Sequence, residues 1–543
     1  MKRFPWLHMR KKTAPELPYE PPFWFGNQSN GEYFHHATAR QRKIRKLILE
    51  KADENARRIG MPRRDFLASA MGMCTSLWVL NYVSGCSTDE PVGSGGGGSG
   101  GGGGSGGADS SPDAKYCVPE DGMFDENVAC NAVGGNQFIF DIQTHHFRKE
   151  DLVRFPTYID LFGTLFDRTT QEIYIDTMFC DSDTTMAALS SWPGIACTDA
   201  VPLDGGQCGL PLSNESNMAS RDHINQLSKR TQRIVNHYQV MAQDAGGVEA
   251  QLLLMEQLKC TLNPVAWKLY PGFSVPKAFT MDDAIGRAVI EKGIDLGIPL
   301  FCIHKGLPIG SFFDVDFGNH PREIGKVAKE YPEAKLIIYH SGICTGFSAC
   351  NMAPPEGPYN DTEENPVGVN AFIRSVVSAG LPPNSNVYAE TGSSYNRAAV
   401  YQDPTVAAHY FGKLMKYIGT DNVCWGTDCV ISGSPQPYIE AFRALEIPQS
   451  MRDQYGYPAL DNTTPEGMMN KAKILGLNAA KAYGVDPEKI RCALDQCPIT
   501  KRKKEMDEEL GPRRWSFQPP GGPKTYDEFL EDSYAAAALG RPG

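Results

Sequence analysis

The sequence predicts a (β/α)8 barrel, a TIM-barrel α/β fold, over residues 117–490. Three observations predict it: short β-rich runs alternate with helical stretches, eight such runs fit between residues 135 and 485, and their order suits one parallel sheet. The expected strands are Gln137–Gln143, Ile173–Cys180, Arg233–Ala242, Pro264–Leu269, Leu300–His304, Lys335–His340, Asn386–Glu390 and Val423–Asp428. The expected helices are Val248–Leu258, Met281–Leu296, Pro321–Tyr331, Ala371–Ala379, Thr405–Ile418 and Pro437–Leu445.

Two segments do not fit the regular alternation of strand and helix. Residues 181–230 are long for a connection, which predicts an excursion that roofs the barrel mouth. Residues 491–543 are polar and rich in Pro and Gly, which predicts a surface tail and no second domain.

The composition excludes one broad class of function. The chain carries a formal net charge of −11, and 41% of its 543 residues are hydrophobic, as in a soluble globular protein. Such an acidic chain is a poor general partner for nucleic acid. The basic runs at 40–46 and 501–504 are interpreted as solvated helix faces or tails.

Residues 1–86 have the features of a delivery segment. Pro62-Arg63-Arg64-Asp65-Phe66-Leu67 precedes a weakly apolar run to Val83, and this pattern resembles a twin-arginine export signal of bacteria or archaea. The run is short for a membrane span, which needs about 20 apolar residues. Residues 38–58, rich in Arg, Lys, Glu and Ala, predict a polar helix.

A lipid anchor is the second expectation for this segment. Val83-Ser84-Gly85-Cys86 resembles a lipobox, in which Cys86 becomes lipidated at the mature N-terminus, although Cys86 could also be an ordinary residue after an uncleaved anchor. Residues 94–107, almost pure Gly and Ser, predict a flexible tether within residues 87–116. These features together predict an exported, periplasmic or cell-envelope protein that is held at the membrane by this segment.

The cysteines permit disulfide bonds in an oxidising compartment. Thirteen of the 15 cysteines follow Cys86, an odd number that leaves at least one unpaired. The pairs that lie close in sequence are Cys117 with Cys130, Cys197 with Cys208, Cys344 with Cys350, and Cys492 with Cys497.

Polar residues fall at the C-terminal ends of the expected strands, where barrel enzymes carry their catalytic groups. Gln143 and His145 end the first strand and share one face, because side chains two apart point the same way. His304 ends the fifth strand, His340 the sixth and Asp428 the eighth. Each histidine alone is more often a buried, hydrogen-bonded imidazole. Three histidines that end separate strands at the same end of one barrel favour a shared functional site.

Imidazoles with one carboxylate predict a divalent metal, zinc first and manganese or iron as alternatives. Such a metal lowers the pKa of bound water towards about 7 and polarises a carbonyl. Asp428 is expected to ligate the metal and to accept a proton from that water, with His340 as an acid or base.

The layout over about 350 residues resembles the amidohydrolase superfamily, in the branch of aminocarboxymuconate-semialdehyde decarboxylase. The motifs that carry the resemblance are Asp141-x-Gln143-x-His145, His304, His340-Ser341-Gly342, Gly426-Thr427-Asp428 and a closing Ile474-Leu475-Gly476-Leu477-Asn478-Ala479-Ala480. The resemblance implies metal binding by His145, His304 and Asp428, acid–base work by His340, and a homodimer. Gln143 departs from the pattern, because the family has its first metal histidine there. A weaker or oxygen-preferring site, a site made by His145, His304 and Asp428 alone, and loss of the metal are the three outcomes.

Three further residues are candidates for substrate binding. Lys268 ends the fourth strand and could bind an anion, bridge metals if carboxylated, or pair with a carboxylate. Glu390, at the end of the seventh strand, could hold Lys268, orient His340 or contact substrate, and Arg397 follows it. The sequence has neither a phosphate loop nor a Gly-x-Ser-x-Gly elbow, so nucleotide and serine-hydrolase chemistry are not predicted.

Three functions remain open for this set of residues. The first is hydrolysis of an amide, ester or lactone in a small molecule by metal-activated water. The second is metal-dependent, non-oxidative decarboxylation of a carboxylic acid. The third is an inactive barrel used for binding.

Overall fold

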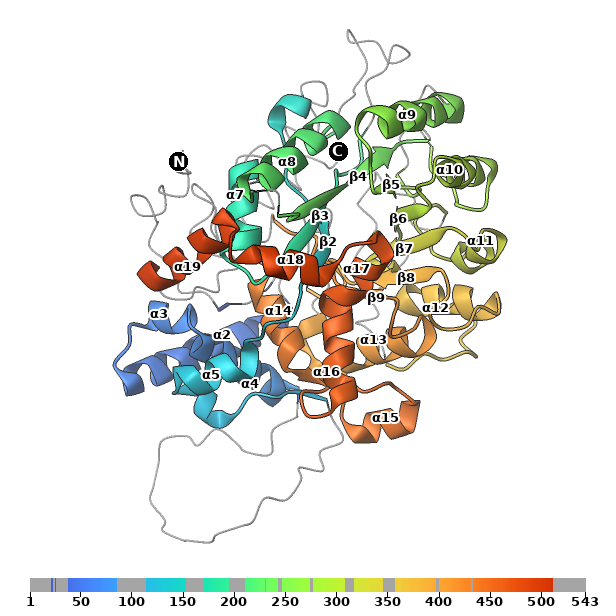
Figure 1. The fold of residues 1–543 in the computed structure, drawn as a ribbon. Helices are drawn as coiled ribbons and strands as arrows, with labels where there is room; N and C mark the ends of the chain where they lie inside the picture. Colours follow the sequence, from blue (N-terminus) through green and yellow to red (C-terminus); the bar gives the residue numbers. More distant parts are fainter. Residues whose placement is uncertain are drawn as a thin grey trace, which may run out of the picture.

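The computed structural model describes residues 21–22, 25, 38–84, 114–152, 169–194, 210–229, 231–242, 247–273, 277–307, 317–344, 357–396, 400–430 and 433–510. Within these residues the predicted barrel is confirmed: eight strands form one parallel sheet in chain order, with helices around it (Figure 1). The strands are β2 (Phe140–Thr144), β3 (Met186–Leu189), β4 (Ile234–Val240), β5 (Ala266–Leu269), β6 (Leu300–His304), β7 (Lys335–Tyr339), β8 (Val387–Glu390) and β9 (Val423–Cys424).

The barrel closes between β2 and the segment that follows β9. Ile142 N donates to Trp425 O at 3.1 Å, and Asp428 N donates to Gln143 O at 2.8 Å. An isolated parallel bridge continues this pairing at Thr144 and Cys429. Closure therefore places the residues after β9 directly beside the end of β2.

The helices outside the barrel cover strands that are buried on both faces, as in parallel sheets generally. They are α8 (Asn214–Leu227), α9 (Gly247–Thr261), α10 (Ala284–Asp295), α11 (Ile324–Glu330), α12 (Gly368–Ser378), α13 (Pro404–Tyr417) and α14 (Gln436–Ala444). Local sequence sets their starts: the carboxylates of Asp283 and Asp403 accept from backbone N–H groups and cap α10 and α13.

The predicted second strand is wrong. Residues 173–180 form the end of α7 (Gln171–Ile175) and a π-helical turn (Asp176–Cys180), and the second strand is β3. Thr170 caps this helix, and its buried residues Tyr174, Ile175, Met178 and Phe179 recur at helical spacing. The expected excursion over residues 181–230 is also wrong in part, because it contains β3 and α8.

The closing helix expected around residues 474–480 is present. It comprises α16 (Pro465–Ala472), a π-helical turn (Lys473–Leu477) and α17 (Asn478–Tyr483). Trp425 N donates to Ile474 O at 2.9 Å, which ties this helix to β9. A Cβ on Gly476 would lie 2.2 Å from Phe138 O, so only glycine lets the helix approach the start of β2 so closely.

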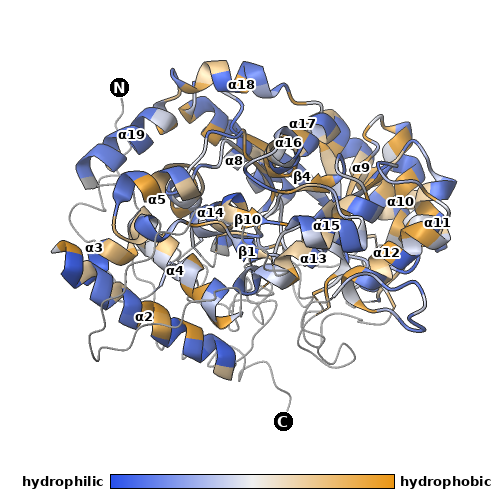
Figure 2. Ribbon diagram, turned by 90° about the horizontal axis from the view of Figure 1, so that it is seen from below, coloured by the Kyte–Doolittle hydropathy of each residue, from blue (hydrophilic) through white to orange (hydrophobic). Residues whose placement is uncertain are grey.

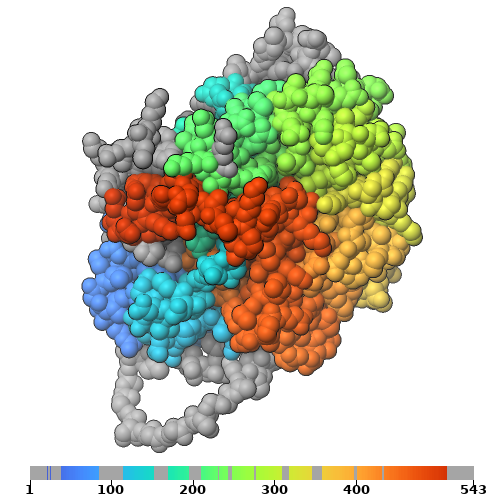
Figure 3. Space-filling model, viewed as in Figure 1, coloured from blue at the N-terminus to red at the C-terminus, as the bar shows by residue number. Residues whose placement is uncertain are grey.

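The expected C-terminal tail begins with helices. Two further helices, α18 (Pro487–Leu494) and α19 (Pro498–Leu510), continue the chain, and α19 packs on the π-helical turn Asp176–Cys180. Figure 3 shows these C-terminal helices, in red, crossing the near face of the molecule. Residues 511–543 lie outside the described residues.

The described residues before the barrel are largely helical. The polar helix predicted at 38–58 is α2 (Ala39–Ile59), and α3 (Arg63–Leu67), α4 (Ala70–Val83) and α5 (Glu126–Val133) follow it. A short strand, β1 (Lys115–Tyr116), pairs antiparallel with β10 (Leu445–Glu446) after α14. Among the described residues, no helix combines the length and the apolar character needed to span a bilayer.

The cysteine pairs are settled for only part of the chain. Cys344 is disulfide-bonded. Cys117, Cys492 and Cys497 are thiols, so Cys492 and Cys497 do not pair with each other. Cys86, Cys197, Cys208 and Cys350 lie outside the described residues.

A buried lysine in α16, Lys471, predicts a change of stability with pH. Burial lowers the pKa of Lys471 to about 8, although its ammonium donates to Arg443 O at 2.6 Å and Asn462 Oδ1 at 2.8 Å. Between pH 8 and about 10.4 the unfolded chain keeps this proton and the folded chain has lost it, so the free energy of unfolding rises with pH. Urea unfolding should show that, across this pH range, the free energy of unfolding of the parent rises by on the order of 3 kcal/mol relative to that of Lys471→Met. A difference in free energy of unfolding between parent and variant that does not change with pH would contradict the lowered pKa of Lys471.

Candidate active site

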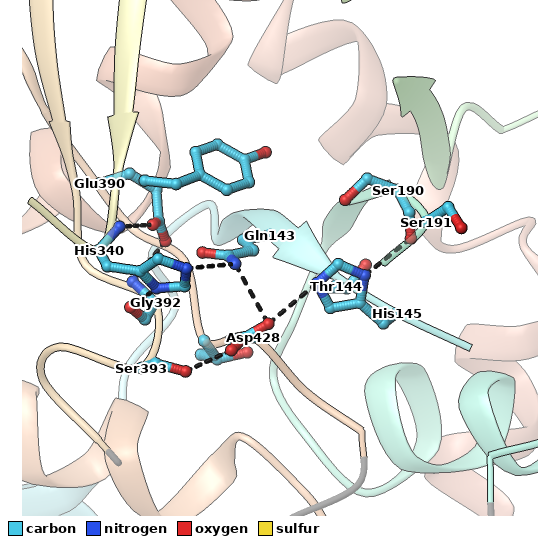
Figure 4. A network of polar contacts seen from close by, with 12 residues as sticks. Gln143, Thr144, His145, Ser190, Ser191, His340, Glu390, Gly392, Ser393 and Asp428 are labelled. Carbon is cyan, nitrogen blue, oxygen red and sulfur yellow. Dashed lines mark hydrogen bonds and ion pairs between the residues drawn. The ribbon is translucent and has the colours of Figure 1, made fainter. Parts of the chain in front are cut away.

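The structure brings together five of the residues that the sequence singled out, at the C-terminal end of the barrel, and Figure 4 shows four of them, Gln143, His145, His340 and Asp428. His145 Nε2 lies 2.9 Å from Asp428 Oδ1, and Gln143 Nε2 donates to the same oxygen at 3.1 Å. Gln143 Nε2 also lies 3.5 Å from His340 Nε2. The His304 and His340 rings meet edge to face, with centroids 4.5 Å apart. All five side chains are buried, at 0 or 1% exposure.

Backbone geometry aims two of these side chains into the barrel. His340 and Asp428 have φ values of 63° and 59°, in the left-handed region that costs energy for residues with a Cβ. The Glu390 carboxylate accepts from His340 N at 2.9 Å, which holds the backbone of His340 in this conformation. The Asp141 carboxylate accepts from the N–H and hydroxyl of Thr427, which holds the backbone just before Asp428. The surroundings thus compensate for the strain at both positions.

A hydrogen bond at Nδ1 holds each of the three imidazole rings in place. Nδ1 of His145 donates to Ser190 O at 2.7 Å, and Nδ1 of His340 donates to Gly392 O at 2.8 Å. Nδ1 of His304 lies 3.1 Å from Asn319 Oδ1. Because these oxygens only accept, Nδ1 carries the hydrogen in all three rings, and Nε2 is the reactive nitrogen.

Burial keeps two of the imidazoles neutral near pH 7. It lowers the pKa of His340 to about 4, against the opposing effect of the Asp428 charge. It also lowers the pKa of His304 well below its usual value, and the positive charge of Lys268 acts in the same direction. His340 therefore presents an unprotonated Nε2, which is the form a general base requires.

The three candidates for substrate binding have different positions. Lys268 is buried, and its ammonium lies 3.3 Å from the centroid of the Tyr339 ring. Glu390 binds the backbone N–H groups of His340 and Gly392, so it orients His340, which was one of its predicted roles. Arg397 lies outside the described residues.

Sequence reasoning missed three residues of the site. The Ser393 hydroxyl donates to Asp428 Oδ2, Ser190 O holds His145, and Asn319 holds His304. Ser393 follows β8 by a few residues, so its place after a strand end was a usable signal. Asn319 lies well beyond β6, and nothing in the sequence pattern points to it.

A divalent ion needs at least three donor atoms around one point. Across the described ranges, no group of three His, Cys, Asp or Glu side chains could hold one. His145 and Asp428 supply two adjacent donors. Gln143 turns its amide N–H, which is not a ligand, towards the carboxylate, while its Oε1 packs at Gly392, where a Cβ would lie 2.3 Å away. This arrangement does not fit a metal ion, and the zinc, manganese or iron of the sequence analysis stays a prediction.

We expect Asn319 to act as a positioning residue for His304. Its amide accepts from His304 Nδ1–H and donates to Gly306 O at 2.7 Å. Asn319→Leu removes this acceptor, so the Nδ1–H tautomer of His304 should lose its advantage over the Nε2–H tautomer. Nitrogen NMR of the His304 ring should report a mixture of tautomers in this variant. Asn319→Asp keeps an acceptor and should keep the single tautomer, and equal spectra for both variants would contradict the role.

The chain resembles several solved structures at low sequence identity. No family model matches the chain, and no curated protein matches it. Similar solved structures include 2,6-dihydroxybenzoate decarboxylase from Rhizobium, at 13% identity and a TM-score of 0.36, covering 64% of this chain and 99% of that one. A second is 4-oxalomesaconate hydratase from Rhodopseudomonas palustris, at 16% identity and a TM-score of 0.35, covering 68% and 100%. A third is amidohydrolase 2 from Bifidobacterium longum subsp. infantis, at 12% identity and a TM-score of 0.32. The match covers 64% of this chain and 100% of that one.

Proposed function

We propose that this chain is an enzyme that hydrolyses an amide, ester or lactone bond in a small molecule. The observation that carries the proposal is a base and an acid held on either side of Gln143. His340 Nε2 is the base, and the contact between His145 and Asp428 is the acid.

The hydrogen-bond partners of His145 and Asp428 account for a shared proton between them. Nδ1 of His145 already carries a hydrogen, which it donates to Ser190 O. Two lone pairs would repel at the 2.9 Å between His145 Nε2 and Asp428 Oδ1, so a proton lies between them. Asp428 also accepts from Gln143 and Ser393, which keeps its oxygens in place.

The reaction follows from these two groups. His340 Nε2 takes a proton from water while the water oxygen bonds to the carbonyl carbon. The C–N or C–O bond then breaks, and the leaving group takes the proton held between His145 and Asp428. General acid–base catalysis of this kind contributes about 10²- to 10⁴-fold.

Lys268 favours decarboxylation as the second candidate. Its buried ammonium lowers the pKa of His304 and His340 through its charge, so it acts close to both rings. A substrate carboxylate that reaches this ammonium would form a charge-assisted hydrogen bond with it. The same acid could then protonate the carbon that loses carbon dioxide.

The test is turnover by the full chain on esters, lactones, amides and unsaturated or aromatic carboxylic acids. Acid release without carbon dioxide supports hydrolysis, and carbon dioxide release supports decarboxylation instead. Turnover of neither kind, by a folded protein, would contradict both proposals and favour the inactive barrel.

A further inference from the structure

The N-terminal helices form a layer of the folded protein, and the helix that resembles an export segment lies inside that layer. α4 (Ala70–Val83) is buried on nearly every face from Ala70 to Asn81, with Trp78 half-buried. A helix that is apolar and buried all round is an interior element. Figure 2 shows α4 between α2 and α14, and α4 contacts α2, α5 and α14.

Apolar side chains join this layer to the barrel. Ile44 and Ile48 of α2 and Leu77 of α4 belong to one continuous buried cluster. The same cluster includes Phe442 of α14 and Tyr401 before α13. In Figure 3 the blue and cyan N-terminal residues adjoin the orange C-terminal half of the barrel.

Polar contacts fix the position of α4 against the barrel. Asn81 donates from Nδ2 to Tyr116 O and accepts from Tyr116 N, both at 2.9 Å, so its amide pairs with the backbone of β1. The Tyr116 hydroxyl in turn donates to Tyr401 O, and β1 pairs with β10 after α14. A buried amide with both groups satisfied specifies one docked position.

Polar contacts also fix α2. Gln41 Nε2 donates to Gln402 Oε1 at 3.0 Å in a buried contact. The Arg40 guanidinium pairs with the Asp403 carboxylate at 2.9 Å and also donates to Ser84 Oγ at 2.7 Å. Asp403 caps α13, so the start of α2, the end of α4 and the start of a barrel helix meet at one point.

We infer that residues 38–84 are a retained structural layer of the mature protein and not a leader that is cut away. A cleaved leader leaves nothing to cover the faces of α5, α14 and β1 that α4 buries. Retention is incompatible with Cys86 as the mature N-terminus, and it agrees with the alternative in which Cys86 follows an uncleaved segment.

The test separates the layer from the barrel without deleting either. A specific protease site is placed in the Gly/Ser segment 94–107 of the full chain, and the purified protein is cut there. The N-terminal fragment should co-elute with the barrel in gel filtration, and the melting temperature should stay unchanged. A fragment that separates from a barrel of unchanged melting temperature overturns the inference.

Two substitutions in α2 give a matched control. Ile48→Asp places a carboxylate in the buried face and should release the fragment after cutting. Lys46→Asp places one on the exposed face, two residues away, and should not. If Ile48→Asp fails to fold, Asn81→Ala serves in its place, because loss of two hydrogen bonds should release the cut fragment about tenfold faster.

The mass of the protein recovered from producing cells is the second readout. Retention predicts that residues 38–84 are present in the folded protein. A folded protein whose chain begins after residue 84 overturns the inference, even if the cut fragment binds in vitro.

Discussion

His340→Asn should lower kcat about 10²- to 10⁴-fold and leave the fold intact. Asparagine tolerates the left-handed backbone at this position, where φ is 63°. Its amide N–H can replace Nδ1–H as the donor to Gly392 O. The substitution therefore removes the base at Nε2 and keeps both features that position the residue. Steady-state kinetics with the substrate identified by turnover checks the expected loss.

His409→Asn is the matched control. His409 is also largely buried, and its Nδ1 lies 3.0 Å from the Tyr457 hydroxyl, but it lies on α13 outside the barrel. Its substitution should leave kcat unchanged. A parent-like kcat in His340→Asn, or equal losses in both variants, would show that His340 is not the base.

The fold was predictable where apolar runs are bounded by clear turns. β6 and β7 carry continuous apolar runs and lie at or within one residue of the expected bounds. The second strand failed because residues 173–180 are apolar at a spacing that suits a buried helix as well as a strand. The turn Asp176–Cys180 packs on α19, and this contact is distant in sequence, so a local pattern does not reveal it.

The N-terminal layer shows a second limit of local patterns. Paired arginines followed by an apolar run describe α3 and α4 as well as they describe an export signal. The partner of α4 is the surface of α5, α14 and β1, which lies up to several hundred residues away. A segment that packs on such distant elements looks the same in sequence as one that leaves the molecule.

The site was predictable at strand ends and not beyond them. His145, His304, His340 and Asp428 end or follow strands of one parallel sheet, so their meeting follows from the fold. The loop residue Asn319 and the carbonyl groups of Ser190 and Gly392 carry no such signal. Their positions depend on how loops fold over the barrel mouth.

Gln143→His should raise the affinity for zinc by about two orders of magnitude or more. Gln143 Nε2 and His145 Nε2 both contact Asp428 Oδ1, so the new imidazole lies beside His145. The amide it replaces already lies 3.1 Å from Asp428 Oδ1. An imidazole nitrogen there joins His145 and Asp428 as the third donor, which is the number a zinc site needs. Zinc competition titrations and elemental analysis of parent and variant measure the change.

Two further variants separate a new ligand from a general effect of the substitution. Gln143→Leu removes the amide without adding a donor, so its zinc affinity should match that of the parent. Adding His145→Ala to Gln143→His leaves two donors and should abolish the gain. Equal, tight zinc binding by the parent and by Gln143→His would mean that the parent's amide already turns its oxygen towards the ion. In that case the contact between Gln143 N–H and Asp428 is broken when metal binds, and the sequence prediction of a metal enzyme holds despite the arrangement seen here.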